Sequence, residues 1–166
     1  QQRLGLTVAY VTHDQSEALA VSDQIIVMND GLIAQRGAPQ EMYERPGSAF
    51  VAGFMGEAML FPGVAQADGT VRLGDLSITP RHALLPGPVK VAVRPEAWHI
   101  QRADVGAGLR AVLRKRAYLG SFFEYTFDTD LGPIFVVSPD LSEVLALGDA
   151  VTLSLADHGV SVVSAA

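Results

Sequence analysis

A histidine at the boundary between two sequence patterns, His13, is the residue in this chain best placed to do chemistry. Residues 7–11 form an apolar, β-branched run, and residues 14–18 carry a helix-starting pattern. A side chain at such a junction stands at the carboxyl end of a strand, where open α/β sheets place their ligands. We therefore expect His13 to contact a bound anion or water. The alternative is a histidine that faces solvent or satisfies only local hydrogen bonds.

The elements that would position His13 are a short strand and a capped helix. Residues 6–11 predict the strand, and Asp14 followed three positions later by Glu17 predicts a capping box that starts a helix through Ala20. Asp14 is then the helix cap and Glu17 its capping-box partner. A contact with an opposing subunit is the alternative role for Asp14.

The stretch from residue 24 to residue 56 predicts a hairpin followed by two short helices. Asp30-Gly31 between two apolar runs is a strong turn signal. Pro39 suits the first turn of one helix, and Ser48 can cap the next. The hairpin strands are residues 24–28 and 32–36, the helices end before Pro46 and at Gly56, and the second helix carries Phe50, Val51, Phe54 and Met55 on one face.

After Gly56 the helix signals disappear, so we expect a domain boundary there. Short alternating runs punctuated by Pro-Gly and Asp-Gly turns predict a small β barrel. Residues 123–127 place aromatic side chains on one face, as in a half-buried strand, and we expect this stripe to be core. The predicted strands are residues 61–66, 70–73, 76–79, 89–94, 109–119, 122–128, 133–138, 151–156 and 160–163.

Composition excludes several classes of protein. The 166 residues are 49% hydrophobic, with a mean hydropathy of +0.25, which suffices for one domain or two small ones. A net charge of −6 disfavours general binding to nucleic acid or anionic lipid. Zero cysteines exclude disulfides and thiol catalysis, and no apolar run approaches the ~20 residues that cross a bilayer. We expect a soluble chain that meets a membrane only through partners.

The remaining histidines and acids do not form a catalytic or metal pattern. The other histidines lack metal-ligand spacing and are expected on the surface, so we predict no metal site. Aspartates near turns favour local backbone hydrogen bonds over general acid or base work. These residues are His82, His99, His158, Asp128, Asp130 and Asp140.

Basic residues gather in one place. Strand alternation would put Arg110, Arg114 and Arg116 on one face, with Lys115 between them, where they could attract an oxyanion or a phosphate backbone. A solvated face is the alternative, since no aromatic platform accompanies them. Arg94-Pro95-Glu96 predicts a structural corner whose charges pair with neighbours, and Trp98 is expected to be partly buried beside it.

Several segments together resemble a known family, the ATP-binding subunits of ABC importers. Residues 10–18, 22–28, 30–31 and 37–39 are similar to the end of that subunit's ATPase domain. The later segments 91–96 and 118–121 resemble its accessory β domain, called TOBE. The resemblance implies an α+β chain: residues 1–56 as the α/β tail of the ATPase domain, and residues 57–166 as an all-β, OB-like TOBE barrel.

In the family, the residue that matches His13 is the switch, or H-loop, histidine. The resemblance therefore implies that His13 contacts the γ-phosphate of ATP and helps to hold the attacking water in the intact subunit. No Gly-x-x-x-x-Gly-Lys-Ser/Thr loop occurs in the chain, and the family's signature motif and magnesium-binding acidic strand are missing too. We expect a piece of a longer polypeptide, with ATP and Mg²⁺ bound by the full-length protein and no ATP hydrolysis by the piece alone.

The resemblance also implies partners and a location. These are a second copy of the subunit, forming a homodimer, and membrane permease subunits that hold it at the cytoplasmic face of the membrane. It lies nearest to importers of ferric iron, polyamines and sugars, with ferric iron slightly preferred. Two alternatives remain open: a β domain that senses an oxyanion such as molybdate or sulfate, and an OB-like binder of single-stranded nucleic acid.

Overall fold

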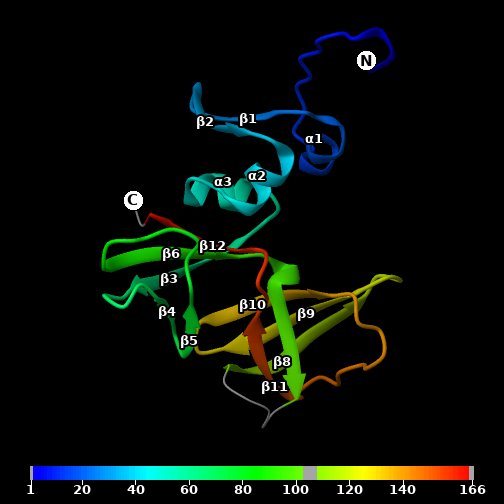
Figure 1. Cartoon of the computed structure of the whole chain (residues 1–166). Coiled ribbons are helices and arrows are strands. Elements are labelled where there is room, and N and C mark those ends of the chain that lie inside the picture. The colour runs from blue at the N-terminus through cyan, green and yellow to red at the C-terminus, as the bar shows by residue number, and fades with distance from the viewer. Residues whose placement is uncertain (1, 103–107, 165–166) are drawn as a thin grey trace.

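Strands dominate the computed structural model, which describes residues 2–102 and 108–164. Figure 1 shows a hairpin and short helices lying above a β body. The elements are η1 Gln2–Leu4, α1 Gln15–Val21, β1 Ile25–Asn29, β2 Leu32–Gly37, α2 Pro39–Glu44, α3 Ala49–Phe54, β3 Met59–Ala65, β4 Val71–Leu73, β5 Leu76–Ile78, β6 Gly87–Val93, η2 Pro95–Ala97, β7 Trp98–Arg102, β8 Leu109–Tyr118, β9 Phe123–Thr129, β10 Gly132–Ser138, β11 Ala150–Leu155 and β12 Val160–Ser164.

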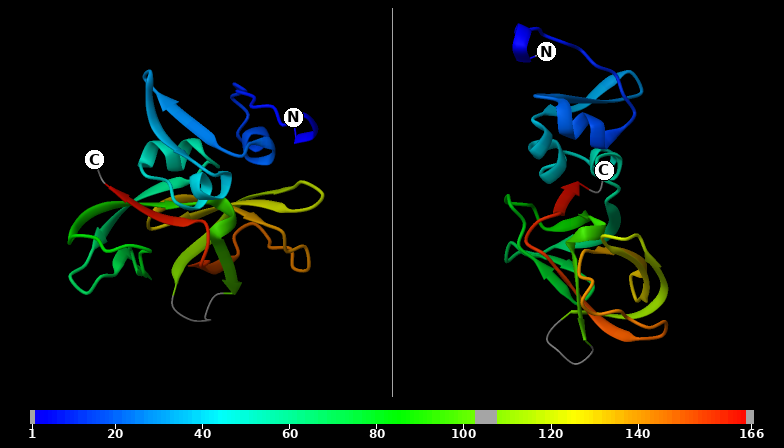
Figure 2. Two further views of the ribbon diagram at one scale, coloured as in Figure 1. Left: turned by 45° about the horizontal axis from the view of Figure 1, so that its top comes forward. Right: turned by 90° about the vertical axis from the view of Figure 1, so that its right-hand side faces the viewer.

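The β body consists of two five-stranded antiparallel sheets that curve like the two halves of a barrel (Figure 2). Their strand orders are β12-β6-β3-β4-β5 and β10-β9-β8-β11-β7. Each strand predicted from residue 61 onward is present to within two residues at either end. The strand that sequence reasoning missed is β7, which follows the corner at Pro95, and Trp98 at its start is buried rather than partly buried.

The aromatic stripe on β9 lies in the main core, as its alternation predicts. Phe123, Tyr125 and Phe127 are buried, and their ring centroids follow one another at 5.4 and 5.8 Å. Aromatic pairs at such spacing add to the free energy that burial itself supplies. On the same face, side chains of β8 and β10 that pair with this face of β9 also point into the core. The aromatic row therefore lies on the core-facing side of the second sheet.

A β-bulge in β8 changes which basic side chains share a face. Leu113 pairs with Phe127, but Lys115 pairs with Thr126 and Arg116 with Tyr125, so Arg114 is the extra residue. A bulge reverses the alternation of all later positions. The expectation that Arg110, Arg114 and Arg116 share one face is therefore wrong, because Arg116 lies on the Tyr125 side.

The stretch from β1 to α3 forms the predicted hairpin and helices around a second, smaller core. Asp30 and Gly31 both have positive φ, 50° and 79°, as a tight two-residue hairpin turn requires. Ser48 accepts a hydrogen bond from the Val51 backbone N–H at 3.2 Å and caps α3. The core consists of Ile25, Val27, Met42, Val51 and Met55.

One face of α3 differs from expectation. Val51 and Met55 are buried as predicted, but Phe50 and Phe54 are 40% and 42% exposed. Their rings stack on each other with centroids 5.8 Å apart. The four side chains therefore do not share one buried face: Val51 and Met55 point into the small core, and Phe50 and Phe54 lie beside it toward solvent.

The strand expected over residues 6–11 is absent from the described residues. This segment joins none of the three described sheets, and Val8, Tyr10 and Val11 are well exposed. An apolar, β-branched run becomes a strand only where a neighbouring strand accepts and donates its backbone hydrogen bonds. His13 thus follows an irregular segment here, not a strand.

Candidate functional site

His13 is exposed and directly precedes Asp14, the N-cap residue of α1. Residues next to His13 in the sequence hold the start of this helix. The Asp14 carboxylate accepts a hydrogen bond from the Glu17 backbone N–H at 3.0 Å, which confirms Asp14 as the helix cap. The Asp14 backbone N–H in turn donates to Thr12 Oγ1 at 3.0 Å. The backbone on the carboxyl side of His13 is thereby fixed while the imidazole faces outward.

Glu17 acts differently from a capping-box partner. Its Oε2 accepts hydrogen bonds from Tyr10 Oη and Thr12 Oγ1, both at 2.9 Å. The Glu17 carboxylate raises the pKa of Tyr10, because an ionised phenol would lose the hydrogen bond and face a like charge. Glu17 therefore ties the segment that precedes His13 back onto α1, which the capping-box prediction did not foresee.

The first residue of α1 connects it to the end of α3. Gln15 Oε1 accepts a hydrogen bond from the Gly56 backbone N–H at 2.7 Å. A depression of about 640 Å³ lies between α1 and α2, and Gln15, Tyr43 and Gly56 form part of its lining. Helix α1 has no buried residue of its own, so polar contacts of this kind add to the packing of its half-buried Ala18 and Leu19.

Arg94 occupies the joint between the helices and the β body. It is only 2% exposed, and its guanidinium donates to the carbonyl oxygens of Met55 and Tyr43. Arg94 Cζ lies 3.5 Å from the centroid of the Tyr43 ring, in a cation–π contact. The predicted corner at residues 94–96 is present, but the Arg94 charge meets helix-end carbonyls rather than an acidic partner.

Tyr43 completes the joint, because its hydroxyl group donates a hydrogen bond to Glu96 Oε1. Burial, aided by the hydrogen bond to Glu96, raises the pKa of Tyr43 to about 12. Burial also lowers the pKa of Arg94 from its ordinary value. Sequence reasoning missed Tyr43 and Gln15. The one usable signal for this joint was Arg94, since an arginine at the end of an apolar strand and just before proline indicates a buried cation.

We predict that Tyr43 ionises about two pH units above an ordinary tyrosine. Because the folded-state pKa is raised, the protonated phenol contributes its full stabilisation below pH 10, and this is lost as the pH rises from 10 through about 12. Ultraviolet titration of the wild type minus Tyr43→Phe should show a difference transition near pH 12. A difference transition near pH 10 would contradict the part-buried hydrogen bond from Tyr43 to Glu96.

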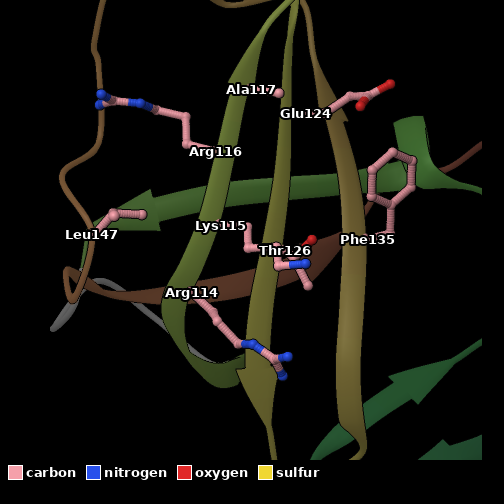
Figure 3. A pocket seen from close by; sticks show the side chains of 8 residues that line it. All are labelled: Arg114, Lys115, Arg116, Ala117, Glu124, Thr126, Phe135 and Leu147. Atoms are coloured by element: carbon pink, nitrogen blue, oxygen red, sulfur yellow. The ribbon is translucent and has the colours of Figure 1, made fainter.

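The basic run of β8 has protein partners at two of its arginines. Arg114 lies 3.3 Å from Asp128 Oδ1, and Arg116 donates to the carbonyl oxygen of Leu145. The two side chains point away from each other across a depression of about 410 Å³, whose lining includes Glu124 (Figure 3). Arg110 is exposed. These contacts favour the alternative of a solvated face. The other prediction, in which the arginines share one face of the strand and bind an oxyanion together, is not supported by this arrangement.

The other candidate residues lie on the surface. His82, His99 and His158 are exposed, and Asp140 accepts hydrogen bonds from both Ser142 N and Ser142 Oγ. Across residues 2–102 and 108–164 no group of three or more histidine or acidic side chains is placed to bind a metal. In Figure 1, α1 lies among the upper elements and β8 lies in the β body below them.

A family comparison shows what most of the β body is similar to. Residues 91–163 match the family model described as TOBE domain, and these residues run from β6 to β12 through both half-barrel sheets. Over these residues the β body is therefore similar to a TOBE domain.

Particular relatives align along almost the entire chain. Over 99% of its length it is 41% identical to the Fe(3+) ions import ATP-binding protein FbpC of Brucella abortus strain 2308, and 45% identical to FbpC 1 of Rhizobium meliloti strain 1021. Each alignment covers 48% of the relative, so the chain spans about half the length of these curated relatives. A solved structure of the cytoplasmic molybdate-binding protein ModG, with molybdate bound, aligns over 63% of this chain and 94% of its own, at 14% identity and a TM-score of 0.48.

The described helices are all too short or too polar to cross a lipid bilayer.

Proposed function

We propose that the chain is the carboxyl-terminal part of the ATP-binding subunit of an ABC importer. The observation that carries this proposal is the 41% identity to an Fe(3+) import ATP-binding protein along 99% of the chain. Residues 1–56 are then the end of the ATPase domain, and residues 57–166 the TOBE domain. Two separate hydrophobic cores, one on either side of Gly56, support this division.

In this proposal His13 is the switch histidine of the subunit. A neutral imidazole donates from one nitrogen and accepts at the other, so it can hydrogen-bond a γ-phosphate and help to position the attacking water. The exposed ring, on a backbone held by Asp14, Thr12 and Glu17, is consistent with such a role. Phosphoryl transfer depends mainly on positioning and electrostatic stabilisation, so one well-placed donor matters.

ATP and Mg²⁺ would be held chiefly by parts of the full-length subunit outside this chain. The chain has no Gly-x-x-x-x-Gly-Lys-Ser/Thr loop to cradle phosphates, so we do not expect it to hydrolyse ATP alone. The proposed partners are a second copy of the subunit and the permease subunits, which would hold it at the cytoplasmic face of the membrane. The TOBE domain would stabilise or regulate the dimer, and the cargo would be ferric iron, as the relatives' names state.

The test is His13→Ala in the full-length subunit assembled with its permease. We expect ATP turnover to fall by about 100-fold, since a lost transition-state donor costs roughly that much, while ATP affinity stays within a factor of about two of the wild type. His82→Ala is the matched control, because His82 is also an exposed histidine but lies in the β body. Turnover of the His13 variant equal to that of the control would remove His13 from the mechanism.

A further inference from the structure

We infer that Arg94 is a positioning residue for the His13 segment, connected to it through the polar contacts of Gly56 and Gln15. The inference rests on the proposed function only where it gives His13 a role. It adds that the TOBE domain influences the proposed nucleotide contact from within the same chain. We call this series of contacts, Arg94 to Met55-Gly56 to Gln15, the Arg94 relay.

The first step of the relay joins the β body to two helix ends. Met55 is the C-cap residue of α3, and Tyr43 lies in the last turn of α2. Carbonyls at helix ends lack partners within the helix and favour a nearby cation. Arg94 donates to both carbonyls from a buried position, where a guanidinium is stable only if its donors are satisfied. The ends of α2 and α3 are thus located relative to β6.

The second step passes through Gly56, which contacts both sides of the relay. Its φ is +89°, and a Cβ at this position would lie 2.2 Å from Arg94 Nη1. Arg94 therefore occupies the space that a side chain would need, directly against the Gly56 backbone. The Gly56 N–H donates to Gln15 Oε1 at 2.7 Å. A displacement of the guanidinium would therefore move the Gly56 backbone and alter its hydrogen bond to Gln15, the first residue of α1.

The third step is the short distance along the chain from Gln15 to His13. Gln15 is the first residue of α1, and Asp14, its cap, directly follows His13. Because α1 has no buried residue and its apolar packing on the small core is through the half-buried Ala18 and Leu19, the hydrogen bond from Gly56 adds a restraint on its first turn beside the Asp14 cap. A change in the TOBE domain that moves Arg94 would alter where the His13 ring stands.

The experiment uses the 166-residue chain and two readouts. Amide hydrogen exchange reports the opening of α1, and the imidazole proton resonances of His13 report the surroundings of the ring. Gln15→Ala should speed exchange in α1 by about tenfold, the equivalent of one hydrogen bond, and shift the His13 resonances. Gln15→Glu, which still accepts a hydrogen bond, should restore both.

The long-range arm uses Arg94→Gln with Arg81→Gln as its matched control. Arg81 also contacts α2, through Glu44 Oε2 at 3.4 Å, but on the surface. Arg94→Gln should change α1 exchange and the His13 resonances, whereas Arg81→Gln should leave both as in the wild type. Equal effects of the two arginine variants, with the β sheets still protected, would overturn the inference.

Two further outcomes keep the inference separate from folding and from the proposed function. If Arg94→Gln unfolds the chain, Gln15→Ala decides: unchanged α1 exchange and unchanged His13 resonances overturn the relay. If full-length His13→Ala keeps normal turnover, the proposed function fails, yet the exchange and resonance data still test the relay by themselves.

Discussion

Replacing Gly56 by alanine is expected to lower the free energy of unfolding by about 3 kcal/mol, from the strain of a left-handed backbone plus unsatisfied helix-end carbonyls. Gly56 has a φ of +89°, and its new Cβ would lie 2.2 Å from Arg94 Nη1 and 2.5 Å from Tyr43 Cε2. The guanidinium cannot yield without releasing the carbonyl oxygens of Met55 and Tyr43. Urea denaturation followed by the fluorescence of the single tryptophan, Trp98, measures the loss.

Gly120→Ala is the matched control for Gly56→Ala. Gly120 has nearly the same φ, +86°, but nothing lies within 4 Å of the position its Cβ would take. We expect a loss of only about 1 kcal/mol, which is the backbone strain alone. Equal losses in the two variants would show that the Arg94 guanidinium moves aside freely and that the joint is not tightly packed.

Replacing Phe127 by alanine is expected to lower the free energy of unfolding by about 3–5 kcal/mol, as in other large-to-small core substitutions. Phe127 of β9 is fully buried and contacts the Tyr125 ring. It pairs with Leu113 of β8 on one side and with Ile134 of β10 on the other. Its loss leaves a cavity between the two half-barrel sheets. Thermal and urea denaturation of the chain provide the measurement.

Phe54→Ala serves as the comparison for Phe127→Ala, since it removes the same side chain from an exposed site. Phe54 is 42% exposed and stacks only on Phe50 among the described rings. A loss of about 1 kcal/mol or less is expected for a surface position. If both phenylalanine variants lost the same stability, the stripe on β9 would not be the centre of the core.

Local patterns predicted the elements well where the interactions that form them are also local. The Asp30-Gly31 turn, the Ser48 and Asp14 caps and the alternation of β9 each depend on backbone conformations or periodicities set within a few residues. Residues 6–11 had an equally clear pattern yet formed no strand. The difference is that a strand needs a partner from elsewhere, and a turn or a cap does not.

Side-chain direction in β8 required more than periodicity. A single extra residue at Arg114 turns Arg116 to the Tyr125 side and separates it from Arg110. The bulge arises from how β8 pairs with β9, and pairing is a property of two segments together. No count of positions along β8 alone would have found it.

The sequence by itself determined the order of most elements, the shift to an all-β chain after Gly56 and the family resemblance that singles out His13, because these depend on residue types and spacing. Only the tertiary structure decided that Arg94 is buried and bound to the ends of α2 and α3, and that Gln15 accepts from Gly56. The physical reason is separation: Arg94 lies 39 and 51 residues from its two acceptors. Contacts over such distances come into being only when the small core and the β body are packed together.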